Sequence, residues 1–448
     1  MYKMNYLEKL EALCRDIDAR QPSLRIAKQY HDGTQALSFL SPIARKQLGD
    51  RLTHISIGYP RLATDSVAER MTLTGFVRNG EPLSAVWSAF ARSGSATLAD
   101  DAIHTALKLG RAHIVVWAHD SGLPLATVER DMATERDPIT HRVVWAAKKW
   151  RRPDDSTRAV LYGPDAVRVY SGPSVTSGGV VPNSGWSLLE TVANPLGVCP
   201  VVELVNAHDP WDTAGQPESA PIWSLTDLLC KTFSDIAVSS ESSAMPRRWA
   251  SGLQLQFDAE GNLVAPFDNS PGAVWLSESG DTKFGGFPEP KLEAYSALTE
   301  SILRQIGALS GLPDHLIGVH SADPSSAEMQ RSAEQSLSAR ATKKTARFGA
   351  SFGQVASLME AIMANRPVRD DISATWKSTE VRGFAAQADG VTKLYQSGLL
   401  PWESAMAELG YSPDQITSMR QARIREQLDR SPIPALPAVT EEPDDAEG

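Results

Sequence analysis

Gly311-Leu-Pro-Asp-His-Leu-Ile-Gly-Val-His-Ser-Ala-Asp-Pro324 is a short segment broken by glycine and proline, and it carries His315 and His320. Such a composition predicts a loop. Amphipathic patterns flank it: residues 289–309 have apolar positions at helical spacing, and residues 326–364 contain no proline and only two glycines. The sequence thus predicts two helices joined by a projecting loop. Repeated around a ring, this unit would place a collar of loops at a central hole.

A third helix and a β-containing module precede this unit. Pro221 opens a helix over residues 222–245, whose apolar stripe is Ile222, Leu225, Leu229, Phe233 and Ile236. Residues 246–288, between this helix and the next, hold short strands and turns. The predicted order is therefore helix, β-module, helix, loop and long helix.

The rest of the chain mixes helices and strands, so the predicted fold class is α+β. Residues 1–110 have mostly helical patterns, and β-branched and aromatic runs over 111–205 predict an antiparallel meander. A lone strand is predicted at 371–376 and further helix at 385–428. Residues 431–448 are rich in proline and acidic residues, which predicts a disordered tail.

Length and charge limit the possible functions. The 448 residues suffice for two to four domains, and no apolar run approaches membrane-spanning length. The charged N-terminus lacks the apolar core of a signal peptide, so no membrane association is predicted and the cytoplasm is the expected compartment. The net charge of −10 argues against a broad basic surface that grips nucleic acid. It is compatible with an acidic wall past which DNA slides.

No pattern of catalysis, cofactor or metal binding stands out. The P-loop, nucleophile-elbow and zinc-protease motifs are absent from the sequence, so we expect no enzyme and no cofactor. Cys14, Cys199 and Cys230 are far apart and are interpreted as small buried apolar residues. Asp100-Asp101 with His104 resembles a metal-ligand spacing, but a solvated helix start is the preferred interpretation.

One basic stripe lies on the predicted long helix. Its members are spaced i, i+3, i+4 and i+7: Arg340, Lys343, Lys344 and Arg347. This spacing places all four side chains on one helix face. The face could contact DNA in a channel, pair with carboxylates of a neighbouring subunit, or be solvated, and the pattern does not choose among these.

The chain resembles the portal proteins of tailed double-stranded DNA bacteriophages, in the branch common among phages of actinobacteria. The resemblance covers residues 20–425 and rests on the order and spacing of several stretches, none of them a strong motif alone. These are Tyr30-His-Asp-Gly33 with Leu37-Ser-Phe-Leu-Ser-Pro42; Tyr59-Pro-Arg-Leu-Ala-Thr-Asp-Ser-Val-Ala-Glu-Arg70; Asn194-Pro-Leu-Gly-Val-Cys-Pro-Val-Val202; Pro246-Arg-Arg-Trp-Ala-Ser-Gly252; Lys283-Phe-Gly-Gly-Phe287; and Ile306-Gly-Ala-Leu-Ser-Gly-Leu-Pro313 leading into Pro324-Ser-Ser-Ala-Glu328.

The resemblance implies the portal fold and an assignment of its regions. They are a wing (1–221, with a return strand in 365–384), two stem helices (222–245 and 289–310), a clip (246–288), a tunnel loop (311–325), a long helix (326–364), a helical crown (385–430) and the acidic tail (431–448). It also implies a homo-oligomeric ring of about twelve subunits, closed by head-to-tail contacts.

The implied function is structural. The ring would occupy one capsid vertex of the virion after assembly in the host cytoplasm. It would dock the packaging terminase, let double-stranded DNA through, retain it, and then bind the head–tail connector. Major capsid and scaffolding proteins are the other implied partners. The missing P-loop agrees with a portal that does not itself hydrolyse ATP.

The resemblance also implies site residues. The tunnel-loop residues Leu312, His315, Leu316, Ile317 and His320 would meet DNA, although solvated turn positions for the two histidines are equally compatible with the sequence. Arg247, Arg248 and Trp249, at the start of the clip, would contact partners or neighbouring subunits. The alternatives are another capsid-associated or minor head protein and, more remotely, a hydrolase or nuclease with a dispersed active site.

Overall fold

The computed structural model describes residues 5–36, 55–93, 97–118, 122–209, 212–244, 248–252, 256–259, 263–264, 275–277, 280–286, 293–318, 327–379, 384–411 and 413–430. The chain forms two compact units, Met1–Glu380 and Val381–Gly448. His320 and Arg247 lie outside the described residues. Within those residues, no helix is both long enough and apolar enough to cross a membrane.

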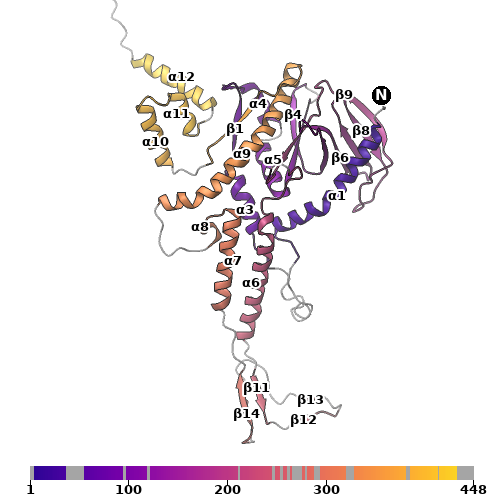
Figure 1. The fold of residues 1–448 in the computed structure, drawn as a ribbon, viewed down its shortest axis with the longest axis vertical. Helices are drawn as coiled ribbons and strands as arrows, with labels where there is room; N and C mark the ends of the chain where they lie inside the picture. Colours follow the sequence, from indigo (N-terminus) through magenta and orange to yellow (C-terminus); the bar gives the residue numbers. More distant parts are fainter. Residues whose placement is uncertain are drawn as a thin grey trace, which may run out of the picture. The chain divides into compact units, whose positions relative to one another are not determined.

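The first half of the first unit combines helices with three antiparallel sheets (Figure 1). The helices are α1 (Tyr6–Asp32), α3 (Tyr59–Ala68), α4 (Ser84–Arg92) and α5 (Leu98–Leu109). The strands are β1 (Leu73–Arg78), β2 (Glu81–Pro82), β3 (Arg111–Ala118), β4 (Pro124–Glu129), β5 (Met132–Arg136), β6 (Val143–Arg151), β7 (Thr157–Tyr162), β8 (Ala166–Gly172), β9 (Ser187–Ala193) and β10 (Val201–Val205).

The second half contains the predicted helix–module–helix order. The 3-10 turn η2 (Ala220–Ile222) leads into α6 (Trp223–Ala244). The module holds β11 (Arg248–Ser251), β12 (Gln256–Phe257), β13 (Leu263–Val264) and β14 (Lys283–Gly286). After it come α7 (Glu293–Ser310), α8 (Asp314–Ile317), α9 (Ala327–Ala364) and β15 (Ser373–Trp376). The second unit consists, in its described part, of α10 (Phe384–Gln396), α11 (Trp402–Glu408) and α12 (Pro413–Arg430).

The predicted meander is in fact two sheets. One has the order β10-β3-β4, and the other has the order β5-β6-β7-β8-β9. The strand β10 returns to pair with β3, where Val202 lies opposite Ile114. Both residues are buried, because β3 packs against α5 and α9. Helix α1 covers the five-stranded sheet, with Leu10 and Leu13 in a common core with Trp145.

The long helix α9 organises the main core. Phe348 and Phe352 are fully buried in a cluster that includes residues of α3, α4, α5, β3 and β10. A Cβ at Gly353 would lie 2.4 Å from the carbonyl oxygen of Ile372, so glycine permits this close approach. The predicted lone strand at 371–376 is therefore not alone: β15 pairs with β1 in the sheet β15-β1-β2.

A buried ionic cluster joins the sheet β10-β3-β4 to the five-stranded sheet. The Glu203 side chain on β10 is only 2% exposed, and Arg111 and Arg136 reach it at 2.9 and 2.7 Å. His113 lies 3.5 Å away. Burial alone would raise the pKa of Glu203, but His113 and the two guanidinium groups lower it well below its usual range. Glu203 is therefore an ionised carboxylate that holds β3 and β5 to β10.

An ion-pair network fixes the end of α9. Glu360 accepts a hydrogen bond from Arg78 at 2.8 Å and lies 2.7 Å from Arg366. Hydrogen bonds from Arg78, opposed by partial burial, lower the pKa of Glu360 to about 2. A carboxylate with a depressed folded-state pKa adds stability above its unfolded pKa of about 4.3, and that stability is lost as the pH falls toward 2.

We expect Glu360→Gln to lower the free energy of unfolding by about 2 kcal/mol at pH 7. The deficit relative to wild type should shrink as the pH falls from about 4.5 toward 2, because protonation removes the same charge from the wild type. Urea denaturation at pH 7 and at pH 3 measures the loss of stability and its dependence on pH. Glu190→Gln, on the exposed strand β9, is the control and should change little. Equal deficits at both pH values would contradict the account.

Candidate functional site

Two glycine turns and a hydrogen bond to α3 hold the segment after α7 against the core. Gly311 adopts a left-handed φ of 73°, and its N–H donates to Gly307 O at 2.8 Å, which ends the helix. Pro313 then precedes the short helix α8, which ends at Gly318 with φ 77°. The Tyr59 hydroxyl donates to Ile317 O at 2.9 Å and ties α8 to α3. Residues 311–318 are therefore a fixed connection.

Two predicted DNA-contacting residues are core residues instead. Leu312 is 4% exposed and Ile317 is 1% exposed, and both belong to the cluster that contains Phe348. Leu316 packs partly buried against the same cluster. The prediction that Leu312 and Ile317 meet DNA is wrong, because buried side chains in one subunit cannot reach a ligand outside it. Apolar residues beside a helix end fold back onto the core when the turn permits it.

The remaining tunnel-loop candidates are the two histidines. His315 is exposed, and its Nε2 lies 3.7 Å from Glu334 Oε1 on α9. His320 lies outside the described residues, as do residues 319–326. Of the predicted tunnel loop, 311–325, only residues 311–318 are therefore described.

Most of the predicted basic stripe makes contacts within its own chain. Arg340 lies 3.2 Å and Lys344 lies 2.6 Å from the carboxylate of Glu218, which is 1% exposed. Arg340 also donates to Leu309 O at 2.8 Å, and Arg347 donates to Ala207 O. The DNA-facing and intersubunit interpretations are therefore wrong for Lys344, which is largely buried. Only Lys343 is fully on the exposed face.

Glu218 is the ion-pair partner of the basic stripe, and the sequence pattern did not identify it. Burial would raise the pKa of Glu218, but Lys344 lowers it below its usual range. Asn206 donates to the same carboxylate at 3.1 Å. The stripe lines a cavity of about 420 Å³ together with Asn206 and Glu218. The cluster locks α9 to the turn that leads into α6.

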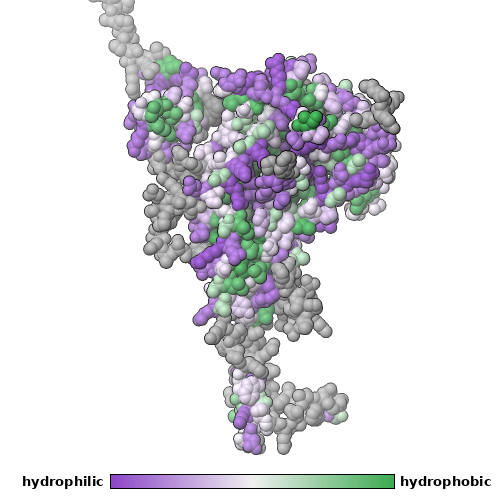
Figure 2. Space-filling view, viewed as in Figure 1, coloured by the Kyte–Doolittle hydropathy of each residue, from purple (hydrophilic) through white to green (hydrophobic). Residues whose placement is uncertain are grey.

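The helix pair α6–α7 leaves apolar surface uncovered. Leu229 and Ile306 are fully buried in the main core, as the predicted stripes require. Phe233 on α6 and Leu298 on α7 belong to the same stripes but are 38% and 44% exposed. Leu228 and Leu309 are also exposed. Figure 2 shows this apolar surface over the helix pair. A stripe that continues past its intramolecular partner indicates a second partner.

The β-module offers open strand edges. Among the described residues, β11 and β14 pair only with each other, so each keeps an unpaired edge. Trp249 and Phe284 are exposed on this pair, and the Trp249 ring lies against Gly285, where a Cβ would approach it to 2.4 Å. Arg248 lies 5.9 Å from the Trp275 ring centroid. The pair can thus accept a strand or an apolar group from another chain.

The structure places both the three cysteines and the acidic start of α5 with His104. Cys14, Cys199 and Cys230 are buried free thiols, as predicted, and burial raises the pKa of Cys14 to about 11. Asp101 accepts a hydrogen bond from Thr97 at 3.0 Å at the start of α5. His104 turns away from that pair and lies 2.9 Å from Asp65 on α3.

Two portal proteins of mycobacteriophages are similar to this chain over most of its length. The portal protein of Mycobacterium phage L5 is 27% identical over 418 residues, which cover 88% of this chain and 83% of that protein. The portal protein of Mycobacterium phage D29 is 26% identical over 433 residues, 92% of this chain and 88% of that one. The alternative of another capsid-associated protein is not favoured by these relatives.

A solved structure is also similar, at a lower level. The neck of a native gene transfer agent particle, computed with C12 symmetry, covers 84% of this chain and 95% of its own, at 16% identity and a TM-score of 0.46. The family profile described as "Phage portal protein, SPP1 Gp6-like" matches residues 26–429, almost the whole chain. The chain belongs to this family of phage portal proteins.

Proposed function

We propose that this phage portal protein acts as a ring at one capsid vertex, and that double-stranded DNA is packaged and ejected through the ring. The observation that carries the proposal is the helix pair α6–α7, whose apolar stripes extend onto the exposed Phe233 and Leu298. In a closed ring, each subunit would cover this surface of its neighbour through a heterologous contact. Membership of the portal family supports the same arrangement.

The β-module is the proposed docking element for partners. Its open edges and the exposed Trp249 and Phe284 suit main-chain pairing with a neighbour, the packaging terminase or the head–tail connector. Major capsid and scaffolding proteins would contact the ring elsewhere, during assembly in the host cytoplasm. The proposed role is structural and requires no catalysis by this chain.

DNA contact is assigned to the loop between Gly318 and α9. Gly318 follows the buried Ile317 at the end of α8, and α9 begins at Ala327. The loop therefore connects two helices. The sequence of this loop, Val319-His-Ser-Ala-Asp-Pro-Ser-Ser326, contains one acidic side chain, Asp323, and no lysine or arginine. A weakly charged loop suits contact with a moving duplex, because strong phosphate binding would slow its passage.

Replacing residues 319–323 by Gly-Ser-Gly is expected to leave ring assembly intact and to impair DNA packaging or retention. The change spares Leu316 and Ile317, whereas a deletion from residue 314 would cut into the core. Nuclease-protected DNA per purified head measures the effect. A matched control replaces the five exposed residues 176–180 in the same way. Filled and stable heads from the 319–323 variant would refute the assignment of the loop.

A further inference from the structure

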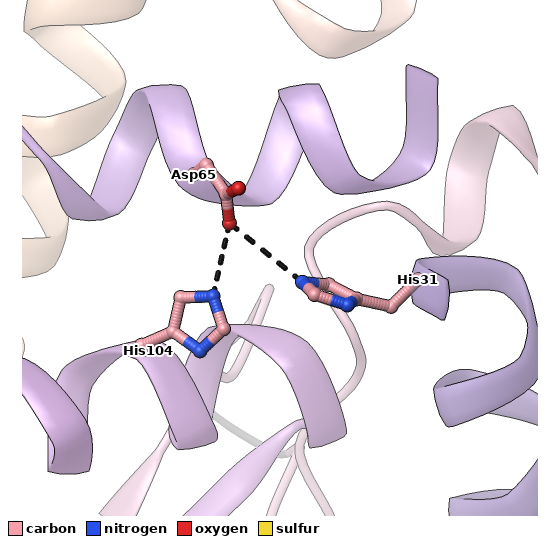
Figure 3. A group of neighbouring side chains, drawn as sticks. All are labelled: His31, Asp65 and His104. Atoms are coloured by element: carbon pink, nitrogen blue, oxygen red, sulfur yellow. Dashed lines mark hydrogen bonds and ion pairs between the residues drawn. The ribbon is translucent and has the colours of Figure 1, made fainter. Parts of the chain in front are cut away.

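Three side chains from three helices converge on one point in the first unit (Figure 3). His31 lies in the last turn of α1, Asp65 lies on α3 and His104 lies on α5. His104 Nε2 is 2.9 Å and His31 Nε2 is 3.6 Å from the same oxygen, Asp65 Oδ1. One ligand atom from each of the three residues lies within 4.8 Å of those of the other two. The residues are 34 and 39 positions apart, so only the fold brings them together.

The His31 ring is held so that Nε2 presents a lone pair. Its Nδ1 lies 3.1 Å from the Asp32 carboxylate, which Lys108 approaches to 2.8 Å. A carboxylate cannot donate, so Nδ1 carries the proton and Nε2 is the acceptor. Such a carboxylate–histidine pair is the usual support of a metal-binding imidazole.

His31 Nε2 is a buried polar atom without a hydrogen-bond partner. The residue is 7% exposed, so water does not compensate for the missing bond. Its nearest carboxylate oxygen, Asp65 Oδ1, is a second acceptor, and two facing lone pairs repel unless a cation lies between them. Without the ion, His104 Nε2 carries a proton and donates to Asp65 Oδ1 at 2.9 Å, so on ion binding that proton moves to His104 Nδ1.

We propose that His31 Nε2, Asp65 Oδ1 and His104 Nε2 bind a divalent transition-metal ion of the zinc type. Bonds of about 2.0–2.1 Å in a tetrahedral site place ligand atoms about 3.3 Å apart, close to the 2.9 and 3.6 Å separations here. The His104 side chain is 39% exposed and can rotate to complete the geometry. Water supplies the fourth ligand on the open side.

The ligand chemistry selects the class of ion. Two imidazoles and one carboxylate suit zinc and its neighbours, whereas magnesium and calcium prefer oxygen ligands alone. The two carboxylates of the cluster already have cationic partners without the ion. Arg61 lies 3.2 Å from Asp65 Oδ2, and Lys108 pairs with Asp32. The ion therefore adds its full charge to a neutral cluster, which lowers the affinity relative to an acidic site.

A bound ion would join the end of α1 to α3 and α5. Because α1 covers the five-stranded sheet and α5 packs against β3, the ion would couple the core beneath α1 to the main core. Binding to the folded state alone raises its stability by mass action. The role inferred is structural, and it is independent of the proposed DNA channel.

The test uses the full chain without a histidine tag, stripped of metal with EDTA. Isothermal titration with zinc sulfate is expected to give one equivalent per chain, and saturating zinc should raise Tm by roughly 3 °C. His104→Gln and Asp65→Asn should each lose the equivalent and the Tm shift. His141→Asn is the matched control, since His141 is exposed and has a φ of 56°, which Asn tolerates.

His104 is partly exposed, so His104→Gln is expected to fold, and circular dichroism matching wild type would show it. Zinc uptake by wild type and by His141→Asn, but not by the two ligand variants, would support the site. A wild-type chain that takes up no zinc at 100 µM, a level chosen to saturate about 99% of a site with a Kd near 1 µM, would overturn the proposal. Equal binding in wild type and His104→Gln would overturn it as well.

Discussion

Replacing Phe233 and Leu298 by aspartate is expected to leave the chain folded but monomeric. Both residues continue the apolar stripes of α6 and α7 beyond the part that is buried within the subunit. In a ring, each subunit would bury both residues against its neighbour, and an unpaired carboxylate at such a contact is strongly unfavourable. Because every interface of a ring is identical, one weakened surface weakens all of them.

Multi-angle light scattering measures this effect directly. The double variant should elute near the subunit mass of 48.5 kDa, whereas wild type should elute as a much larger species. The matched control is Leu123→Asp with Ile139→Asp, which places two charges at exposed apolar residues outside the helix pair. Its assembly should match wild type. Rings formed by the Phe233 and Leu298 variant would show that the helix pair is not the subunit contact.

Glu203→Gln is expected to cost about 3–5 kcal/mol of the free energy of unfolding, the largest effect of any single substitution considered for this chain. The change leaves Arg111 and Arg136 without a counter-charge in the space between β10, β3 and β5. Arg111 is itself 10% exposed, so water cannot replace the carboxylate. The glutamine amide also adds a donor that faces other donors.

Urea denaturation followed by tryptophan fluorescence measures this loss. Glu135→Gln is the control, because Glu135 on β5 forms only an exposed ion pair with Lys9, and such a pair contributes about 1 kcal/mol or less. A loss at Glu203 no greater than at Glu135 would mean that the buried cluster does not hold the sheets together.

The order of helices follows from local periodicity, which is why the sequence predicts it. The helix predicted at 326–364 is α9, Ala327–Ala364, because a long proline-free stretch has no competing structure. The sheets were predicted less well. Pairing of β10 with β3, and of β15 with β1, joins residues far apart in the chain. Alternation of apolar residues identifies a strand but not its neighbour.

Prediction of the candidate sites has the same limit, because a local pattern does not reveal a partner that is distant in the chain. Spacing places Arg340 and Lys344 on one helix face, but it cannot reveal that Glu218, over a hundred residues earlier, neutralises them. Loop composition predicts a turn at Gly311, yet it does not show that Leu312 and Ile317 fold back into the core. The local sequence around Glu218 does not distinguish a buried acidic residue from an exposed one, so its ion pairs were not predicted.

The central claim is that this chain forms a ring through which DNA passes. Cryo-electron microscopy of the purified protein, with and without scaffolding protein, tests it most directly. We expect closed rings of about twelve subunits, with a central hole wide enough for duplex DNA and α6–α7 pairs at the subunit contacts. Particles that stay monomeric at high concentration even with scaffolding protein present would contradict the claim.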